Sequence, residues 1–499
     1  MDVFTNLAVG LDAILNPSAL VACFIGCLTG TLIGVLPGIG PLATIAMLLP
    51  MTYGLEPVSA MVMLAGIYYG AQYGGSTTAI LCKMPGEVSS IITTIDGHEL
   101  ARQGRAGAAL TIAAIGSFVA GCFATVVIAF LAPLLASVAL KFNSPEYFAL
   151  MVLGLIASAV LSSGSVINAI LMILLGLWLG LVGTDTTSGM RRFTFGVLDL
   201  ADGIDFVSIA IGLFGISEII RNLETGVTGG LVKSKIKSLL PTRDDWRRAT
   251  PAIARGSIIG SALGILPGGG AMLSAFASYI VEKSRSKRPE EFGKGAIEGV
   301  AGPESANNAG AQTSFIPMLT LGIPSNALMA LFIGALLLQG IQPGPNVVTK
   351  QPALFWGLVV SMWIGNLMLV IINLPLVGIW IKLLRMPYTY LYPAIILLCG
   401  IGIYSTTASF FQVGMAALFG VVGYLLLKLD CEPAPLVMGF ILGPMMEENL
   451  RRSLILSRGD PTIFVTHPIS ATLLVAAALL LALNLFANFR KGRDEVFQE

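Results

Sequence analysis

Charged side chains are scarce in this sequence. Asp, Glu, Lys and Arg together make up 11% of its 499 residues, whereas soluble domains carry about 25%. Uncharged stretches run over 147–184, 305–349 and 386–427, and a membrane-spanning helix needs only about 20 apolar residues. No long polar region is left that could fold as a separate soluble domain. The chain is therefore predicted to be an all-α integral membrane protein.

The sequence also lacks the motifs that power or catalyse reactions in membranes. It contains no G-x4-G-K-[ST] phosphate-binding loop, so we expect no ATP hydrolysis. It contains neither H-E-x-x-H nor G-x-S-x-G, so an intramembrane hydrolase would lack its usual catalytic groups. Its six cysteines and two histidines form no ligand cluster. We therefore expect a non-enzymatic protein without a cofactor, energised by an ion gradient or by a partner.

Positive charge is missing from the first 82 residues, which contain no Lys or Arg. By contrast, 221–255 contains eight basic residues and 282–294 contains five. Because positive loops stay in the cytoplasm, both ends of 256–281 are predicted to be cytoplasmic. This segment is too short to cross the membrane twice, so a re-entrant hairpin is favoured over a single kinked span. Nothing beside the basic residues points to nucleic-acid binding.

One glycine-rich pattern occurs twice, at positions 230 residues apart. Both copies read G-x3-G-x3-G-x-L-P-G-x-G. Glycines spaced four apart let another helix approach closely, and Pro-Gly interrupts a helix. The copies consist of Gly26, Gly30, Gly34, Leu36, Pro37, Gly38 and Gly40, and of Gly256, Gly260, Gly264, Leu266, Pro267, Gly268 and Gly270. We expect re-entrant hairpins over 22–53 and 253–281, with tips at Pro37–Gly40 and Pro267–Gly270.

The second copy lies between the two basic clusters, whereas the first has no basic neighbours. This difference indicates two inverted repeats, a pattern typical of secondary transporters. We expect the repeats to occupy 1–222 and 253–499, with a basic cytoplasmic linker at 223–252 and about 10–12 membrane spans in total. The apolar segments 351–381 and 468–489 are expected to form an outer scaffold that faces lipid or a partner.

Each break in a membrane helix frees backbone N–H and C=O groups, which cost several kcal/mol when unsatisfied. Such a break persists where protein, water or a ligand meets these groups. Helix N-termini favour anions, released carbonyls favour cations, and glycine allows close backbone approach. We therefore predict that the tips contact a carboxylate substrate through Gly38, Gly40, Gly268, Gly269 and Gly270.

Two stretches are unusually polar for their surroundings, GAQYGGSTTAIL at 70–81 and AGPESANNAGAQTSFIP at 301–317. Neutral donors suit a carboxylate that must bind and also leave, and their oxygens suit Na+. The predicted substrate contacts are Ser76, Thr77, Thr78, Ser305, Asn307 and Asn308. The predicted ion-coupling residues are Gln72, Glu304, Asn308 and Gln312.

These assignments have structural alternatives. The Ser and Asn side chains could instead hydrogen-bond neighbouring helices, and Glu304 could be a surface charge where a helix begins. Lys83 and Glu87 are expected at the membrane interface, and His98 and His467 on the protein surface.

Several of these stretches resemble a known family. GTLIGVLPGIGPLATIAMLLP, YYGAQYGGSTTAILCKMPG, IDGHELARQGRAG and GPESANNAGAQTSFIPMLTLGIPSNAL are similar to the large membrane subunit of the tripartite tricarboxylate transporters. The resemblance covers nearly the whole chain, with a departure at Ser325, where Gly is often expected. It implies import of carboxylates such as citrate across the bacterial inner membrane and symport with Na+ or H+. It also implies two partners, a small membrane subunit and an extracytoplasmic solute-binding protein.

Other functions stay open on the sequence alone. A stand-alone carboxylate exchanger or exporter would share the hairpins but would need no partner. A channel or a membrane enzyme is a weaker alternative, because no catalytic constellation appears. The sequence also leaves open which carboxylate is carried, whether copies of the chain associate, and whether the hairpins slide as an elevator or rock around a fixed site.

Overall fold

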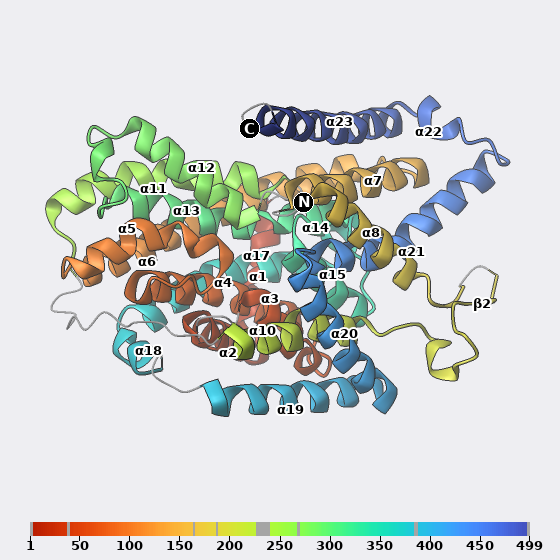
Figure 1. Ribbon diagram of the computed structural model, residues 1–499, viewed down its shortest axis with the longest axis horizontal. Coiled ribbons are helices and arrows are strands. Elements are labelled where there is room, and N and C mark those ends of the chain that lie inside the picture. Colours follow the sequence, from red (N-terminus) through yellow and green to blue (C-terminus); the bar gives the residue numbers. More distant parts are fainter. Residues whose placement is uncertain are drawn as a thin grey trace.

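The structure is a computed structural model that describes residues 3–36, 40–162, 165–185, 188–225, 240–266, 270–383 and 388–496 (Figure 1). It is built almost entirely of helices. The strands in the described part are β1 (Gly183–Thr184) and β2 (Arg191–Arg192), which pair antiparallel with Gly183 opposite Arg192. The predicted all-α fold class is confirmed.

Several helices begin at proline, which suits a first turn because its missing N–H is not needed there. The helical elements before the basic region are α1 (Val3–Leu15), α2 (Pro17–Val35), α3 (Pro41–Leu48), η1 (Leu49–Thr52), α4 (Pro57–Cys82), η2 (Val88–Ile91), α5 (Thr93–Arg102), α6 (Ala106–Ala139), α7 (Ser144–Leu161), α8 (Val166–Gly180), η3 (Leu198–Leu200), α9 (Phe206–Ala210), the π-helical η4 (Ile211–Ile216) and α10 (Ser217–Thr225).

The second half starts within the predicted linker, because α11 begins at Arg243 with Thr242 as its N-cap. Its helical elements are α11 (Arg243–Gly264), α12 (Gly270–Arg285), η5 (Pro289–Glu291), α13 (Glu298–Thr313), α14 (Phe315–Leu321), α15 (Ala327–Leu338), α16 (Pro345–Lys350), α17 (Pro352–Asn373), α18 (Val377–Leu383), α19 (Tyr388–Thr407), α20 (Phe410–Lys428), α21 (Pro433–Leu456), α22 (Ile463–Thr466) and α23 (Pro468–Val496).

Among the described residues, five helical segments are long and apolar enough to cross a membrane. They are Pro17–Val35, Ala106–Ala139, Phe206–Glu224, Pro352–Asn373 and Phe410–Lys428. Shorter apolar helices accompany them, such as Val166–Gly180 and Ala327–Leu338. The protein is therefore a multi-pass membrane protein, and the count of about 10–12 spans stays a prediction.

The two polar stretches lie on helices that are enclosed by the rest of the protein. Every residue from Ser59 to Cys82 on α4 is buried, and so is every residue from Gly299 to Thr313 on α13. A helix buried on all sides needs other helices around it. The apolar helices supply this enclosure and leave their own outer faces for lipid.

Spaced glycines let one helix pack directly on the backbone of another in the first half. A Cβ atom added to Gly26, Gly30 or Gly34 of α2 would collide with backbone carbonyl oxygens of α4. The carbonyls belong, in the same order, to Met63, Ile67 and Ala71. Because both sets of numbers rise together, α2 and α4 run parallel. The close approach predicted from the glycine spacing is confirmed here.

The same packing recurs in the second half. A Cβ atom added to Gly256, Gly260 or Gly264 of α11 would collide with carbonyl oxygens of Gly302, Ala306 and Gly310 on α13. These two helices are therefore also parallel. Glycines of α13 in turn face α12 in reverse order, since a Cβ at Gly302 would meet Ser278 and Glu282 and one at Gly310 would meet Ser274. Helix α12 thus runs back along α11 and α13.

Both glycine-rich motifs interrupt a helix and reverse the chain. Helix α2 ends at Val35 and α3 begins at Pro41, while α11 ends at Gly264 and α12 begins at Gly270. A parallel α2 and α4 require the intervening chain to return toward the start of α2. The helix breaks are thus confirmed, although Pro37, Gly38, Pro267, Gly268 and Gly269 themselves lie outside the described residues.

The two halves meet along α4 and α13–α14, which run in opposite directions. At one end Ser76 of α4 contacts Glu304 of α13. At the other end the ring of Tyr68 lies 6.4 Å from that of Phe315 on α14. The later residue of α4 therefore meets the earlier residue of the second half, which is an antiparallel arrangement.

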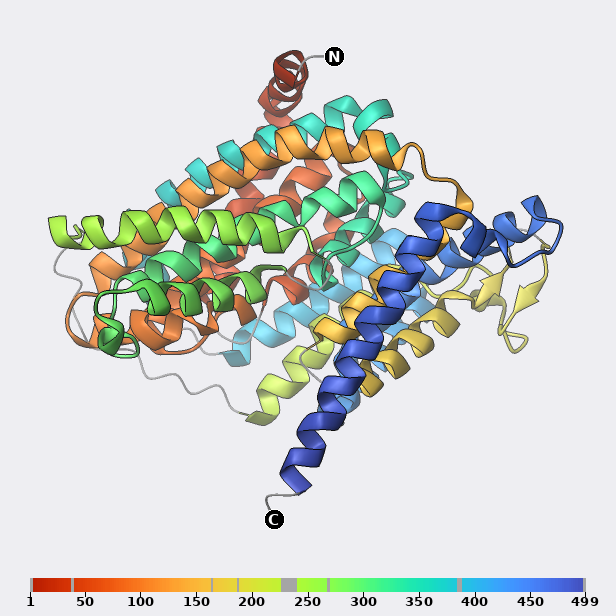
Figure 2. The same cartoon turned by 90° about the horizontal axis from the view of Figure 1, so that it is seen from above.

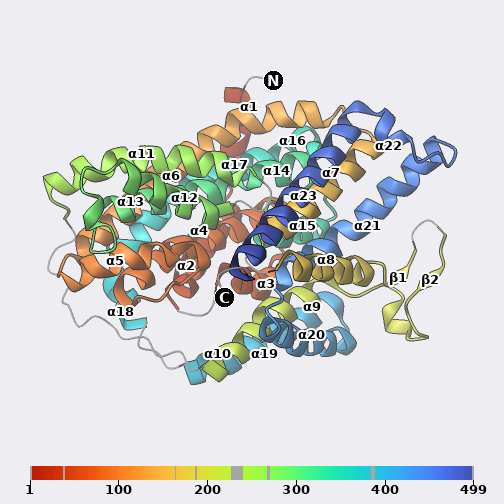
Figure 3. The same ribbon diagram turned by 45° about the horizontal axis from the view of Figure 1, so that its top comes forward.

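Outer helices surround this centre. Helix α23 lies along α7, and Figure 2 shows it crossing one face of the molecule. Figure 3 places α5, α11, α12 and α13 on one side and β1 and β2 on the far side. Helix α17 packs against α1, α2, α4 and α6 and buries Asn366 and Asn373. Leu367 and Ile371 of α17 are exposed, so the expectation that 351–381 is scaffold facing lipid or a partner stays a prediction.

Candidate functional site

Glu304 joins the two polar stretches in the interior of the protein. It lies in the second turn of α13 and is fully buried. Ser76 on α4 donates a hydrogen bond from Oγ to Oε2 at 2.5 Å, and Thr93 at the start of α5 donates to Oε1. Glu304 is therefore not an exposed charge at a helix start, and that alternative is wrong.

A second buried carboxylate, Glu87, belongs to the same network. Asn307 donates from Nδ2 to Glu87 Oε1 at 3.1 Å. Ser89 Oγ contacts Glu87 Oε1 and lies 2.7 Å from Asn307 Oδ1 and 3.1 Å from Gln72 Oε1. These residues connect α4, η2 and α13. The prediction of Glu87 at the membrane interface is wrong, whereas Lys83 is exposed at the end of α4.

The other polar face of α13 is hydrogen-bonded to α6. Asn308 donates from Nδ2 to Ser117 Oγ at 2.7 Å, and Thr125 donates to Gln312 Oε1 at 3.0 Å. Ser305 is buried, and its Oγ lies near Gly116 of α6 rather than in the Glu304 network. The structure thus separates Asn308, Gln312 and Ser305 from Asn307, which lies with the two carboxylates.

Hydroxyl groups satisfy the carbonyls at both helix breaks. Thr78 donates to the carbonyl oxygen of Val35 at 2.7 Å, where α2 ends. Ser314 lies 3.2 Å from the carbonyl oxygen of Gly264, where α11 ends. The two breaks therefore recruit a partner from the polar stretch of their own half, which meets the requirement for satisfied backbone groups in a membrane.

The described ends of the two tips have different surroundings. A Cβ atom at Gly40 would meet nothing within 4 Å. Gly270 has a φ of +50°, which favours glycine, and a Cβ there would lie 3.2 Å from the amide nitrogen of Asn326. Asn326 caps α15 and lies 3.4 Å from Ser314 Oγ. Gly270 thus lies beside the end of α13.

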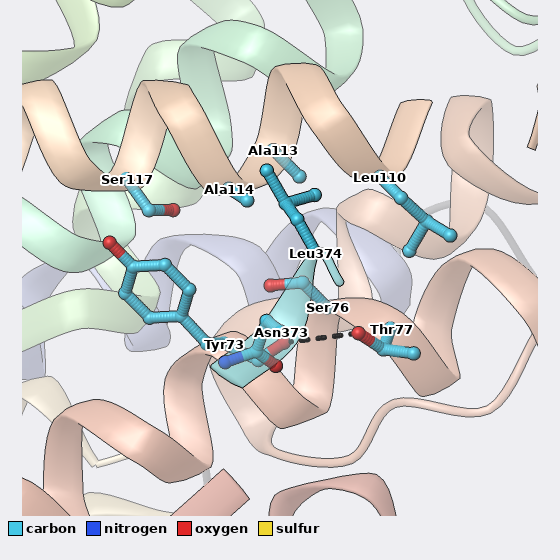
Figure 4. Close-up of a pocket in the computed structure, with 9 residues that line it drawn as sticks. All are labelled: Tyr73, Ser76, Thr77, Leu110, Ala113, Ala114, Ser117, Asn373 and Leu374. Carbon is cyan, nitrogen blue, oxygen red and sulfur yellow. Dashed lines mark hydrogen bonds between the residues drawn. The ribbon is translucent and has the colours of Figure 1, made fainter. Parts of the chain in front are cut away.

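A small cavity adjoins Ser76 (Figure 4). The centre of a water molecule can occupy a volume of about 10 Å³ in this cavity. That is room for about one water molecule, and it is too small for a tricarboxylate. Thr77 lines this cavity, whereas Thr78 does not. The polar residues around it are Tyr73, Ser76, Thr77, Ser117 and Asn373.

The network has two carboxylates and no basic partner for them. Within the described part of the chain, no ion pair joins Glu87 or Glu304 to Lys, Arg or His. The described part of the chain also includes no group of three or more His, Cys, Asp or Glu that could hold a metal ion. The ligands on offer are hydroxyl, amide and carboxylate oxygens, which suit H+ or Na+.

Ion pairs connect the helices at the basic end of the molecule. Arg248 forms ion pairs with Glu298 at 2.7 Å and with Glu291 at 2.6 Å. These hydrogen bonds raise the pKa of the guanidinium, while Arg248 lowers the pKa of Glu291.

The two histidines differ in their exposure. His98 is buried against the carbonyl of Ile80, so its predicted surface position is wrong. His467 lies beside Glu146 at 2.8 Å and is partly exposed.

Comparisons with known proteins give one family match and two similar proteins. The sequence profile of the "Tripartite tricarboxylate transporter TctA family" matches residues 20–438. The "Uncharacterized 52.8 kDa protein in TAR-I ttuC' 3'region" of Agrobacterium vitis is 57% identical over all of this chain and 99% of its own length. The "Uncharacterized protein in TAR-II ttuC' 3'region" of the same organism is 60% identical over 48% of this chain and 99% of its own length. No solved structure matches the chain.

Proposed function

Since the chain belongs to the tripartite tricarboxylate transporter TctA family, a family of transporters and not of enzymes, we propose that it is the membrane-translocating subunit of a carboxylate importer. Its substrates are tricarboxylates or related carboxylates such as citrate. It works with a small membrane subunit and an extracytoplasmic solute-binding protein in the bacterial inner membrane. A Na+ or H+ gradient drives the import.

The observation that carries this proposal is the buried polar network between α4 and α13. Asn307, Ser76 and Thr93 lie around two carboxylates at a junction of the two halves of the chain. Asn307, Ser76 and Thr93 are neutral donors, which suit a carboxylate that must bind and also leave once H+ or Na+ has offset the charges of Glu87 and Glu304. Enclosure by apolar helices keeps the network away from lipid, where polar residues are costly and therefore usually functional.

The directions of the helices support two inverted repeats over 1–222 and 253–499. Helices α2 and α4 are parallel, α11 and α13 are parallel, and α4 and α13–α14 are antiparallel. The glycine contacts and the hydroxyl caps at the breaks recur in both halves. Two oppositely directed hairpins can each close one side of a shared site, which is the arrangement that alternating access requires.

The test is uptake into proteoliposomes that contain this chain, its small membrane subunit and the binding protein. A panel of labelled carboxylates is offered with an imposed Na+ gradient, an imposed pH gradient or neither. We expect gradient-dependent uptake that disappears when either partner is omitted. Uptake without both partners would instead identify a stand-alone exchanger, and current without saturation would identify a channel.

A further inference from the structure

The loop 181–205, which joins α8 to α9, exposes a cluster of large apolar side chains. Phe195 is 80% exposed and Leu198 is 71% exposed. Large apolar side chains that gather on a loop outside the helices mark an interaction surface. The apolar loop surface, as we call it below, consists of Met190, Phe193, Phe195, Val197 and Leu198.

This loop lies on the side of the membrane opposite to the basic loops. The candidate span Phe206–Glu224 follows the loop directly. The basic residues within 221–255 keep the far end of that span in the cytoplasm, so its near end is extracytoplasmic. Figure 3 agrees with this assignment, because β1 and β2 lie at one end of the molecule, away from α5, α11 and α12. The apolar loop surface is therefore accessible to proteins outside the cytoplasm.

Ion pairs fasten the loop to α21. Arg192 donates to both carboxylate oxygens of Glu447, at 2.7 and 3.2 Å, and Arg451 donates to Asp185 at 3.1 Å. The backbone N–H of Asp185 donates to the carbonyl oxygen of Met190 at 2.9 Å. The loop is thus held in a defined shape, which reduces the conformational entropy that would be lost when a partner binds.

Two phenylalanines of the loop adopt a backbone conformation that is rare for large side chains. The φ angles are +54° at Phe193 and +48° at Phe195. Glycine would adopt this conformation without strain, so folding alone does not explain the two phenylalanines. The ring of Phe193 packs edge-on against Trp178 with 5.8 Å between ring centroids, whereas Phe195 stays exposed. Strained residues of this kind are concentrated at binding sites.

The charges of the loop favour a protein partner over the lipid surface. The loop contains four Asp and two Arg residues, and Asp199 and Asp202 are exposed beside Leu198. Carboxylates repel the anionic headgroups of phospholipids. An apolar centre with a polar rim is instead typical of protein–protein interfaces. The surface therefore fits a partner that has an apolar pocket bordered by basic residues.

We propose that the apolar loop surface is the docking site of the extracytoplasmic solute-binding protein, an inference that rests on the proposed function. Phe195 and Leu198 are the anchors that enter the pocket of the partner. The solute-binding protein is the water-soluble component of such a transporter on this side of the membrane. Because α8 lies in the first half of the chain and α21 in the second, a protein docked on this loop contacts an element that both halves support.

Binding of the purified solute-binding protein tests the proposal directly. The chain and its small membrane subunit are placed in lipid nanodiscs, and the affinity is measured by biolayer interferometry. Phe195→Ser and Leu198→Ser should each weaken binding about tenfold or more, as expected for an anchor residue of an interface. Both side chains are exposed, so neither change disturbs the core. Unchanged affinity in both variants would overturn the docking site.

Leu223→Ser is the matched control. Leu223 is 63% exposed on α10, at the opposite end of the span that follows the loop. The substitution removes an equally large apolar side chain on the cytoplasmic side, where the solute-binding protein has no access. This variant should bind the solute-binding protein like the wild type, and a tenfold loss here would show that the assay does not report on the loop.

A photo-crosslinker distinguishes the possible occupants of the surface. When p-benzoylphenylalanine replaces Phe195, irradiation should link the chain to the purified solute-binding protein. The same group in place of Leu223 should not form this link. Crosslinks from position 195 to the small membrane subunit or to phospholipid, without any to the solute-binding protein, would assign the surface to that component and overturn the proposal.

Uptake into proteoliposomes separates this proposal from the proposed function. The loop variants should need about tenfold more solute-binding protein for half-maximal carboxylate uptake and should reach the wild-type rate when that protein is saturating. Variants with the wild-type requirement would overturn the docking site and leave the proposed function standing. A crosslink from position 195 to the solute-binding protein without any carboxylate uptake by the wild type would contradict the proposed function and support the docking site.

Discussion

Asp96 on α5 accepts a hydrogen bond from the backbone N–H of Gly295 at 2.8 Å, joining positions 199 residues apart. The same oxygen accepts from the N–H groups of Gly293 and Ala296, and Tyr279 donates to the other oxygen. Gly293 and Gly295 have φ values of +85° and +104°, which let their amides converge on one atom. The first half is thereby fastened to the loop that leads into α13.

Asp96→Asn should loosen this connection. The amide has one acceptor oxygen and no charge, so hydrogen bonds to a charged group become weaker ones, at a cost of about 1–3 kcal/mol. We expect a lower melting temperature for the purified protein in detergent. Asp244→Asn, at an exposed position in the first turn of α11, is the control and should melt like the wild type. Equal melting of all three proteins would show that the carboxylate is dispensable.

The glycine contacts predict a second pair of destabilised variants. Gly30→Ala places a methyl group on the backbone of Ile67, and Gly260→Ala places one on the backbone of Ala306. Overpacking of this kind costs about 1–3 kcal/mol, since neither helix can yield without moving its partner. Size-exclusion chromatography after heating measures the loss. Gly414→Ala on α20 meets nothing within 4 Å and should be at least as stable as the wild type.

The sequence could predict the features that follow from a repeated residue spacing or from the local amino-acid composition. The glycine spacing predicted the close packing of α2 and α11, and the Pro-Gly motifs predicted the helix breaks. The concentration of Ser, Asn and Gln predicted a shared role for 70–81 and 301–317, and the structure buries both stretches and joins them at Ser76 and Glu304. These signals are local, and each follows from what a backbone or a buried polar group requires.

Residues that reach the site through loops or from apolar helices gave no such signal. Glu87 follows Met84-Pro85-Gly86, and only the packing of Gly86 on the carbonyl of Gly34 and on Gly75 returns it to α4. Asn373 ends an apolar helix that looked like scaffold. Their partners are Asn307 and the cavity beside Ser76, far away in the sequence. Contacts between segments that lie far apart in the sequence determine both positions, and no periodic pattern in the sequence indicates such contacts.

Asn307 and Asn308 should have different roles in transport. Asn307 bonds to Glu87 and Ser89 in the carboxylate network, while Asn308 bonds to Ser117 on α6. Asn307→Ala should raise the apparent KM for the carboxylate about tenfold, the effect of losing one good hydrogen bond. Asn308→Ala should mainly lower the melting temperature. Uptake into proteoliposomes and thermal melting separate the two effects, and identical behaviour of both variants would contradict the assignment.

The ion pair between Arg255 and Glu282 holds the second hairpin together. Arg255 Nε donates to Glu282 Oε1 at 2.8 Å, and the side chain of Glu282 is only 1% exposed. Arg255→Gln leaves a buried charge unpaired and should destabilise the protein by about 1–3 kcal/mol, less than for a fully buried pair because Arg255 reaches water. The double variant with Glu282→Gln should recover most of this loss. Arg102→Gln, which breaks an exposed pair with Glu99, should change melting little.

The inverted arrangement makes a prediction about sidedness that cysteine labelling can test. In a version without the six native cysteines, single cysteines replace the exposed residues Ser18, Thr250 and Arg285. Positions 250 and 285 lie at the same end of the antiparallel pair α11 and α12, beside the basic loops that stay cytoplasmic. A membrane-impermeant maleimide should therefore reach both of them only in inside-out vesicles.

Ser18 begins α2, which is parallel to α4 and so opposite in direction to α11 and α13. A cysteine at position 18 should react only in right-side-out vesicles. Glu290→Cys, in the exposed η5 segment, provides the cytoplasmic reference for each preparation. Labelling of 250 and 285 from opposite sides would replace the hairpin by a single kinked span. Labelling of positions 18 and 250 from the same side would contradict the inverted arrangement of the two repeats. It would also contradict the argument that two oppositely directed hairpins gate one site.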